Sequence, residues 1–131
     1  MSAVRKISEE MTLCPAIAFD RIVGGKYKLR ILWLLHSRSY RYGELRRLLH
    51  HGDPGASVTP RTLSRELKEL QQRGLIHREQ WEVVPPRVEY SMTERGRSMI
   101  PIVAAIIDWG LTGVHEEILR SSPAHTAGVP L

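Results

Sequence analysis

The sequence contains one cysteine, Cys14, in 131 residues, and it has no long apolar run near its N-terminus. A single cysteine cannot form a disulfide within the chain, which fits a reducing compartment. Without an apolar N-terminal stretch we expect no secretory signal peptide. The longest apolar stretch, Ile100–Ile107, is far shorter than the roughly 20 residues that a membrane span needs. We therefore expect a soluble cytoplasmic protein that does not enter a membrane.

Motifs for catalysis and metal binding are also missing. His50, His51 and Asp53 are the nearest cluster of metal-ligating residue types, but adjacent histidines in a Gly/Pro-containing loop lack the spacing of a known metal site. No glycine-rich phosphate loop follows a predicted strand, and no nucleophile–base motif is visible. These absences predict a protein that is not an enzyme and has no metal or cofactor.

Positive charge is concentrated in the middle of the chain. The formal net charge is +5 and the isoelectric point is near 9.8. Residues 26–73 contain eleven Lys and Arg against four Asp and Glu, a net charge of +7, so the remaining residues sum to −2. In a chain long enough for one domain, such a basic segment favours a nucleic-acid partner. Solubility alone can also produce a basic protein, but it does not explain the clustering.

The stretch Thr59–Gly74 predicts an amphipathic helix with defined ends. Its apolar side chains, spaced by four and three residues, fall on one face: Leu63, Leu67 and Leu70. A favourable N-cap, a first-turn proline and a terminating glycine bound it: Thr59, Pro60 and Gly74. About fourteen residues at ~1.5 Å each span roughly 21 Å, enough to lie in a DNA major groove. The alternative is an ordinary amphipathic surface helix with solvated charges.

Two helical segments are expected before this helix. A short one begins after Cys14-Pro15 and is broken by Gly24-Gly25, and a second covers Lys26–His36. The second has apolar side chains for the core, and we expect Lys26, Lys28 and Arg30 to remain in water.

The pattern that follows predicts a helix-turn-helix. Arg41-Tyr42 is a candidate short strand, and Glu44–His50 is a candidate helix with Arg46 and Arg47 on its outer side. The loop His51–Val58 contains glycine and proline and cannot be helical throughout. A helix, a turn and a second helix with a basic outer face form this motif, although the loop is longer than the usual short turn.

After Gly74 the apolar period changes from that of a helix to that of a strand. Alternating residues on both sides of Pro85-Pro86 predict two strands joined at a hairpin tip. A hairpin directly after a helix-turn-helix is a wing. Because lone hairpins are marginal, one face of it must lean on the helices.

A final long helix is expected from its N-cap, Thr93, to about Arg120. Pro101 lies inside it and predicts a kink in which the Arg97 carbonyl loses its helical partner. The helix is apolar on nearly every face around residues 99–107, whereas a helix lying on one small domain needs one apolar stripe. The apolar surface beyond that one stripe predicts a homodimer contact through Ile102, Val103, Ile106, Ile107 and Trp109. The alternative is a helix buried centrally within one subunit.

These elements predict an α+β protein: a winged helix-turn-helix with N- and C-terminal dimerisation helices, mostly helical with a two-stranded β-wing. We expect residues 1–12 to be a flexible arm, 13–120 the DNA-binding and dimerisation domain, and 121–131 a disordered tail.

In this order, the chain resembles the HxlR-type winged helix-turn-helix transcriptional regulators, which are MarR-like. The residues that carry the resemblance are Cys14-Pro15, Gly24-Gly25-Lys26-Tyr27, Arg41-Tyr42-Gly43-Glu44-Leu45, Leu63…Leu67…Leu70…Gly74-Leu75, and Val84 through Thr93 with Gly96. The resemblance implies a dimeric, bacterial-type regulator that occupies an operator. Tyr27 and Tyr42 stand where Trp and Phe are more usual in the family, and the loop His51–Val58 is longer than the family's turn.

The candidate DNA contacts come from both helices of the motif and from the wing: Arg41, Arg46, Arg47, Thr59, Arg61, Thr62, Ser64, Arg65, Lys68 and Arg87. Arg61 or Arg65 is expected either to read guanine or to contact phosphate only, and Lys68 to contact phosphate. Arg41, Arg46 and Arg47 suit the backbone, although Arg46 and Arg47 could equally be plain surface charge. Arg87 suits a narrow minor groove.

Cys14 is the one residue with candidate reactive chemistry, because a helix N-terminus favours thiolate. The resemblance implies that it could sense an oxidant or electrophile, through an intersubunit disulfide or a mixed disulfide with a small thiol. The alternative is a small apolar residue packed near the dimer seam. Two other functions remain open: a winged helix used for protein–protein contact without sequence-specific DNA binding, and a small-molecule-binding or enzymatic dimer. For the second we find no convergent polar pocket in the sequence.

Overall fold

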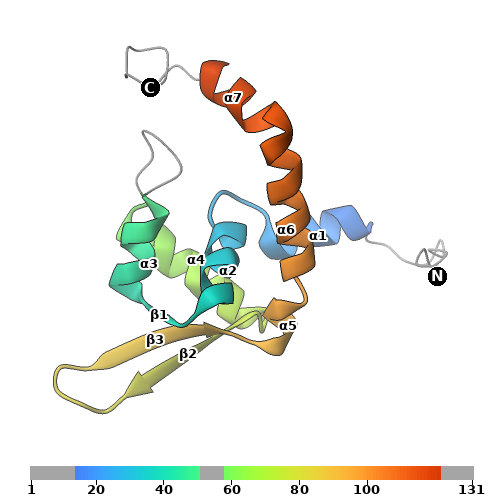
Figure 1. Cartoon of the computed structure of the whole chain (residues 1–131). Coiled ribbons are helices and arrows are strands. Elements are labelled where there is room, and N and C mark those ends of the chain that lie inside the picture. The colour runs from blue at the N-terminus through green and yellow to red at the C-terminus, as the bar shows by residue number, and fades with distance from the viewer. Residues whose placement is uncertain (1–13, 51–57, 122–131) are drawn as a thin grey trace.

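The computed structural model describes residues 14–50 and 58–121, and it is a winged-helix fold of the predicted α+β class (Figure 1). Three predicted segments lie outside the described residues. They are the arm at residues 1–12, residues 51–57 of the loop, and residues 122–131 of the tail.

Helix α1 (Pro15–Val23) and helix α2 (Lys28–Ser37) are separated by the glycine pair, as predicted. Gly25 has φ +101°, a conformation that side-chain-bearing residues rarely adopt. A Cβ on Gly24 would lie 2.1 Å from the Asp20 carbonyl oxygen, so only glycine fits there. Helix α2 begins two residues later than expected.

Strand β1 (Tyr40–Arg41) leads into helix α3 (Tyr42–Leu49), which begins two residues before the predicted helix. The Glu44 carboxylate accepts a hydrogen bond of 2.9 Å from the Arg41 backbone N–H and so caps the early start. Helix α4 (Pro60–Gln72) matches the prediction closely. Thr59 Oγ1 accepts from the Thr62 N–H at 3.1 Å, and Gly74 ends the segment at φ +73°.

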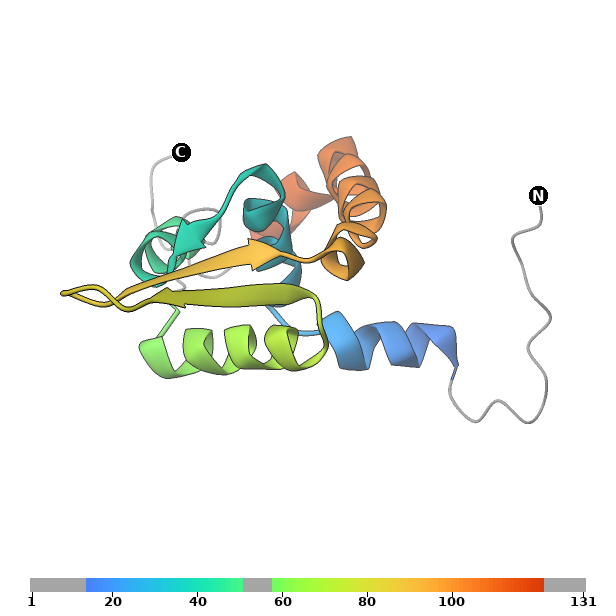
Figure 2. The ribbon, with the colours of Figure 1, turned by 90° about the horizontal axis from the view of Figure 1, so that it is seen from below.

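The sheet contains three antiparallel strands in the order β1-β3-β2, one more than the two-stranded wing that the sequence predicts. Strand β2 (Ile76–Trp81) pairs with strand β3 (Arg87–Met92) from Ile76 opposite Met92 to Trp81 opposite Arg87. Strand β1 adds to the other edge of β3, with Tyr40 opposite Tyr90. Figure 2 shows the three strands one above the other, with α4 running beneath the hairpin.

The core lies where α2, α3 and α4 meet one face of this sheet. Its fully buried side chains are Val23, Ile31, Leu32, Leu45, Leu49, Val58, Leu63, Leu67 and Leu70. The sheet contributes Ile76, Tyr90 and Met92, which alternate along their strands. The hairpin therefore leans on the helices through one face, as predicted.

The prediction of one C-terminal helix kinked at Pro101 is wrong. A short helix α5 (Glu94–Arg97) ends in a turn, and helix α6 (Ile100–Trp109) begins after it. Pro101 lies in the first turn of α6, where its missing N–H has no helical partner to lose. A second change of direction follows at Gly113, φ +107°, inside η1 (Gly110–Val114), and α7 (His115–Ser121) completes the described chain (Figure 1).

Helix α6 is mostly uncovered in the single chain. Val103 is 4% exposed, but Ile102 is 43% exposed and Trp109 is 64% exposed. The alternative of a helix buried centrally within one subunit is therefore wrong for the described chain. The segment Glu94–Val114 is long and apolar enough to cross a membrane on length and composition alone. The break between α5 and α6 and the charged residues Glu94, Arg95, Arg97 and Asp108 argue against a continuous span.

Candidate nucleic-acid interface

Helix α4 separates its apolar and basic side chains onto different faces. Leu63, Leu67 and Leu70 are buried, as their spacing predicts. The opposite face gathers most of the candidate reading residues, all exposed: Arg61, Ser64, Arg65 and Lys68. The structure therefore brings these four predicted DNA-contact residues together on one exposed face of α4.

The start of α4 is held by neighbouring side chains. Thr59 and Thr62, two of the candidate DNA contacts, bond to each other through their hydroxyls at 3.0 Å. The Tyr42 hydroxyl of α3 donates to the Pro60 carbonyl at 3.1 Å. The two helices of the motif are thus joined by the Tyr42–Pro60 hydrogen bond at the end of α4 that carries Arg61.

A buried ion-pair cluster fixes one side of α4 to the start of α2. Lys28 Nζ lies 2.8 Å and 2.9 Å from the two Glu66 carboxylate oxygens and 2.7 Å from Glu69 Oε1. The side chains of Lys28 and Glu66 are each 7% exposed, and that of Glu69 is 45% exposed. The expectation that Lys28 remains in water is wrong, because these two carboxylates draw its ammonium group inward.

The charges in this cluster stabilise one another. Burial opposes the charge on Lys28, but hydrogen bonds to Glu66 and Glu69 outweigh it and raise the pKa of Lys28 above its ordinary value. The hydrogen bond from Lys28 lowers the pKa of Glu69. Arg65 Nε lies 4.0 Å from Glu66 Oε1, so the cluster extends to a candidate base-reading residue. The sequence places Glu66 on the core side of α4, next to Leu63, Leu67 and Leu70, and this position could have indicated a buried cation partner. It could not have indicated that the partner is Lys28.

The basic residues of α3 lie in two places. Arg46 and Arg47 line a shallow pocket of about 460 Å³ with Tyr42, Gly43 and His50. Arg46 Nε also donates to the Val58 carbonyl at 3.4 Å, whereas Arg47 is exposed. Arg41 lies at the other end of α3, where its Cα pairs with Glu89 of β3.

Arg87 does not sit free at the wing tip. It is the first residue of β3, and its guanidinium group forms an ion pair with Glu89, with Nε 2.8 Å from Oε2. The same group lies 5.0 Å from the centre of the Trp81 ring. The exposed residues of the tip include Val83 and Val84, and Val84 is 100% exposed.

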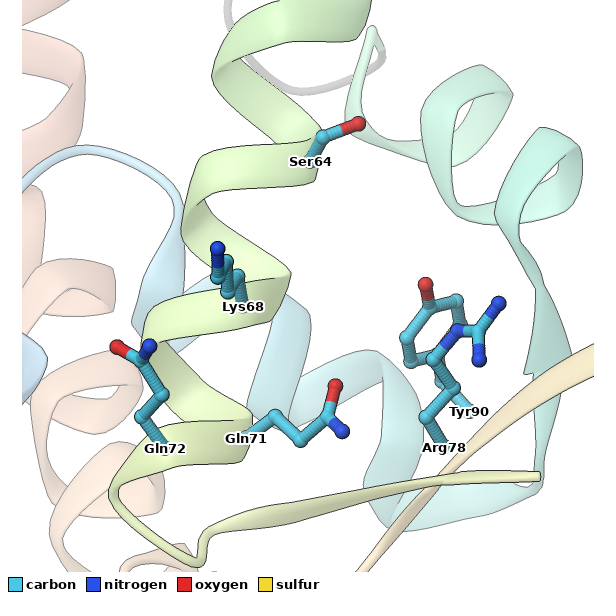
Figure 3. Close-up of a pocket in the computed structure, with 6 residues that line it drawn as sticks. All are labelled: Ser64, Lys68, Gln71, Gln72, Arg78 and Tyr90. Carbon is cyan, nitrogen blue, oxygen red and sulfur yellow. The ribbon is translucent and has the colours of Figure 1, made fainter.

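One polar cleft was not predicted from the sequence. It lies between α4 and the wing strands, has a volume of about 440 Å³, and is lined by Ser64, Lys68, Gln71, Gln72, Arg78 and Tyr90. In Figure 3 Ser64 and Gln71 extend from α4 toward the side of the cleft where Arg78 and Tyr90 lie. We refer to it as the α4–β2 cleft. Because side chains alternate along β2, Arg78 shares a face with the buried Ile76. This alternation could have indicated from the sequence that Arg78 faces α4.

The candidate dimerisation residues divide into two groups. Ile102, Ile106 and Trp109 are exposed, and Ile107 is partly exposed. Val103 is already buried within the chain and has little surface left for a partner. Ile106 and Ile107 also line an apolar groove of about 350 Å³ together with Leu29, Trp33 and Leu34 of α2. The uncovered surface is thus continuous from α2 to α6.

Cys14 is the N-cap residue of α1 and is exposed in the single chain, so its predicted place at a helix N-terminus is confirmed. Within residues 14–50 and 58–121, no group of three His, Cys, Asp or Glu could hold a metal ion. His51 and Asp53, part of the weak histidine cluster, lie outside the described residues.

Comparison with known proteins gives a consistent family. A family model described as HxlR-like helix-turn-helix matches residues 22–118. An HTH-type transcriptional regulator of Methanothermobacter thermautotrophicus is 38% identical over 85% of this chain and 81% of its own length. The HTH-type transcriptional regulator YdeP of Bacillus subtilis is 39% identical over 79% of this chain and 76% of its own. Among solved structures, the reduced form of the redox regulator HypR superimposes with a TM-score of 0.70 at 34% identity, covering 83% of this chain and 100% of that one.

Proposed function

The chain belongs to the HxlR-like helix-turn-helix family and is a transcriptional regulator, and from that premise we propose that it binds a pseudo-palindromic DNA site as a homodimer. The observation that carries the proposal is the exposed face of α4. Its cations Arg61, Arg65 and Lys68 project outward from a helix whose other sides are fixed by the core and by Lys28.

In this proposal α4 is the recognition helix and lies in the major groove. Arg61 and Arg65 are the candidates for guanine, because a guanidinium group can bond both O6 and N7. Ser64, Thr62 and Thr59 contact bases or phosphates near the start of the helix, and Lys68 contacts a phosphate. Because Thr59 caps α4 by accepting a hydrogen bond from the Thr62 N–H, it also fixes the direction in which the helix enters the groove.

The first helix of the motif crosses the DNA backbone. Arg46 and Arg47, gathered around one pocket on α3, suit this role, and Arg41 supports it from the start of the helix. Arg87 contacts the minor groove or its phosphates by exchanging its Glu89 partner for DNA. Salt-dependent affinity measurements on Arg87→Ala test this contact, since unchanged affinity and salt slope would remove Arg87 from the interface.

The second subunit covers the exposed apolar side chains of α6. A monomeric protein rarely leaves large apolar side chains such as Ile102, Ile106 and Trp109 exposed together. A homodimer buries them against their own copies and repeats the recognition helix about 34 Å away, one turn of DNA. We place the protein in the cytoplasm, where a bacterial-type operator is accessible.

We also propose that Cys14 makes the protein responsive to an oxidant. Its thiol is exposed at the first turn of α1, and the relative HypR is a redox regulator. Two thiols, one from each subunit, would form one S–S bond while the oxidant takes up two electrons and two protons. A mixed disulfide would form instead when a small-molecule disulfide exchanges with the Cys14 thiolate and releases its own thiolate.

Selection of DNA fragments with the purified protein, followed by sequencing, tests the function. We expect an enriched inverted repeat whose half-sites are centred about one helical turn apart. A protein–protein interaction module would enrich no sequence and would show no salt-dependent binding.

A further inference from the structure

The wing distributes its charges unequally between its two faces. Because successive strand residues point to opposite sides, Glu79 and its cross-strand partner Glu89 share one face with Arg87. Arg78 and its partner Tyr90 point to the other face, toward α4. The carboxylates therefore lie on the face where Arg87 is already paired, and Arg78 is separated from them.

The α4–β2 cleft brings Arg78 opposite the recognition helix. Lys68 and Ser64 line the cleft from α4, and Arg78 lines it from β2 (Figure 3). No carboxylate is among its lining residues. Lys68 and Arg78 are both exposed, and neither has a hydrogen-bond or ion-pair partner in the part of the chain that the structure describes.

A cleft lined by two cations and no carboxylate has a positive potential that favours a bound anion. Hydroxyl and amide donors from Ser64 and Gln71 add the neutral hydrogen bonds that phosphate groups commonly accept. Lys68 belongs both to this cleft and to the outward face of α4. An anion in the cleft therefore lies beside any DNA that α4 enters.

We propose that the α4–β2 cleft binds one phosphate group of the DNA backbone, held between Lys68 and Arg78. This proposal rests on the DNA-binding function above and adds a contact on the wing strand, Arg78, which is distinct from Arg87. Its role is to fix the depth and register of the recognition helix, because a phosphate contact carries no base information.

The test is the salt dependence of DNA affinity for Arg78→Gln, measured on the selected site and on unrelated DNA of equal length. One phosphate contact fewer makes the slope of log K against log[salt] shallower by about 0.9. At about 0.1 M salt this corresponds to binding that is roughly five- to tenfold weaker, equally on both DNAs. Arg78→Lys keeps the charge and is expected to keep the slope.

Two further variants sharpen the result. Arg120→Gln removes one positive charge from α7, which lies away from the sheet and α4 (Figure 1), and is expected to leave the slope unchanged. Lys68→Gln together with Arg78→Gln is expected to weaken binding by less than the product of the single effects, because both residues hold the same phosphate.

An unchanged slope for Arg78→Gln, while the wild type binds DNA with a salt-dependent affinity, would overturn the phosphate contact and leave the DNA-binding function intact. A loss confined to the selected sequence would overturn it in favour of base reading. A wild type that binds no DNA would overturn both proposals. Titration of the DNA-free protein with inorganic phosphate, followed by NMR, distinguishes a site for a DNA phosphate from a site for a free phosphate anion. Submillimolar binding that Arg78→Gln abolishes, with an unchanged DNA slope, would assign the cleft to a free anion instead.

Discussion

Lys28 Nζ and the Glu66 carboxylate, which are 38 residues apart in sequence, lie within 2.9 Å of each other between α2 and α4. Glu69 completes the contact from the next turn of α4. The cluster joins the start of α2, directly after the glycine pair that ends α1, to the flank of α4. It therefore connects α2 to the helix that we propose reads DNA.

Lys28→Met is expected to destabilise the fold by about 3–5 kcal/mol, because it leaves Glu66 charged, buried and without its partner. Glu69→Gln is the matched comparison. Its side chain is 45% exposed, and its loss is expected to cost no more than about 1 kcal/mol. Urea unfolding of the three proteins measures both values. Equal stability losses in the two variants would show that the buried pair does not hold α4 in place.

The same cluster predicts a pH dependence at both ends of the scale. The pKa of Glu69 is lowered below its ordinary 4.5, so its contribution is present above that pH and is lost as pH falls through the lower, folded-state pKa. The pKa of Lys28 is raised above its ordinary 10.5, so its contribution is present below that pH and is lost as pH rises through the higher, folded-state pKa.

The stability difference between wild type and Glu69→Gln should therefore shrink in acid, below about pH 4.5. Denaturant unfolding between pH 3 and pH 7, a range of roughly four units around the carboxylate pKa, measures it. A difference that stays constant across this range would mean that the Lys28–Glu69 contact does not form in solution.

Trp109→Ser is expected to shift the proposed homodimer toward monomer, because it replaces a large apolar side chain that is 64% exposed in the single chain. We expect the dimer dissociation constant to rise at least about tenfold, which corresponds to ~1.4 kcal/mol. Val84→Ser is the control, since Val84 is fully exposed at the wing tip and outside the proposed interface. Sedimentation equilibrium measures both. An unchanged dimer in Trp109→Ser would place the subunit contact elsewhere.

Oxidation is expected to change DNA binding only when Cys14 is present. Mild oxidant should alter the affinity of the wild type, and a non-reducing gel should separate an intersubunit disulfide from a mixed disulfide. Cys14→Ser should bind DNA as the reduced wild type does and ignore the oxidant. Equal responses of the two proteins would end the sensor proposal and favour Cys14 as a packing residue.

The parts of the fold that were predicted correctly have local signals. Thr59, Pro60 and Gly74 mark the ends of α4 through their own backbone preferences. Pro85-Pro86 similarly separates two alternating stretches, which fixes the wing. The helix boundary before Pro101 was missed because the apolar sequence around it continues without interruption. The preference of proline for the first turn of a helix would have placed the boundary correctly.

The parts that were missed depend on partners far apart in sequence. A short strand was predicted at Arg41-Tyr42, one residue after the observed β1, but its pairing with β3 was missed because nothing near Tyr40 indicates Tyr90 as its partner. Lys28 was expected in water because lysine side chains are usually solvated, whereas the carboxylates that draw it inward come from α4. Arg78 was overlooked because exposed strand residues are ordinary, and only the approach of α4 creates the cleft.

A hydroxyl-radical footprint on the selected DNA site tests the central claim most directly. We predict two protected patches related by twofold symmetry, with centres about 34 Å apart, which Arg65→Ala weakens and Arg120→Gln leaves unchanged. Protection of a single patch, or no protection at any salt concentration, would contradict a homodimer that reads DNA through α4.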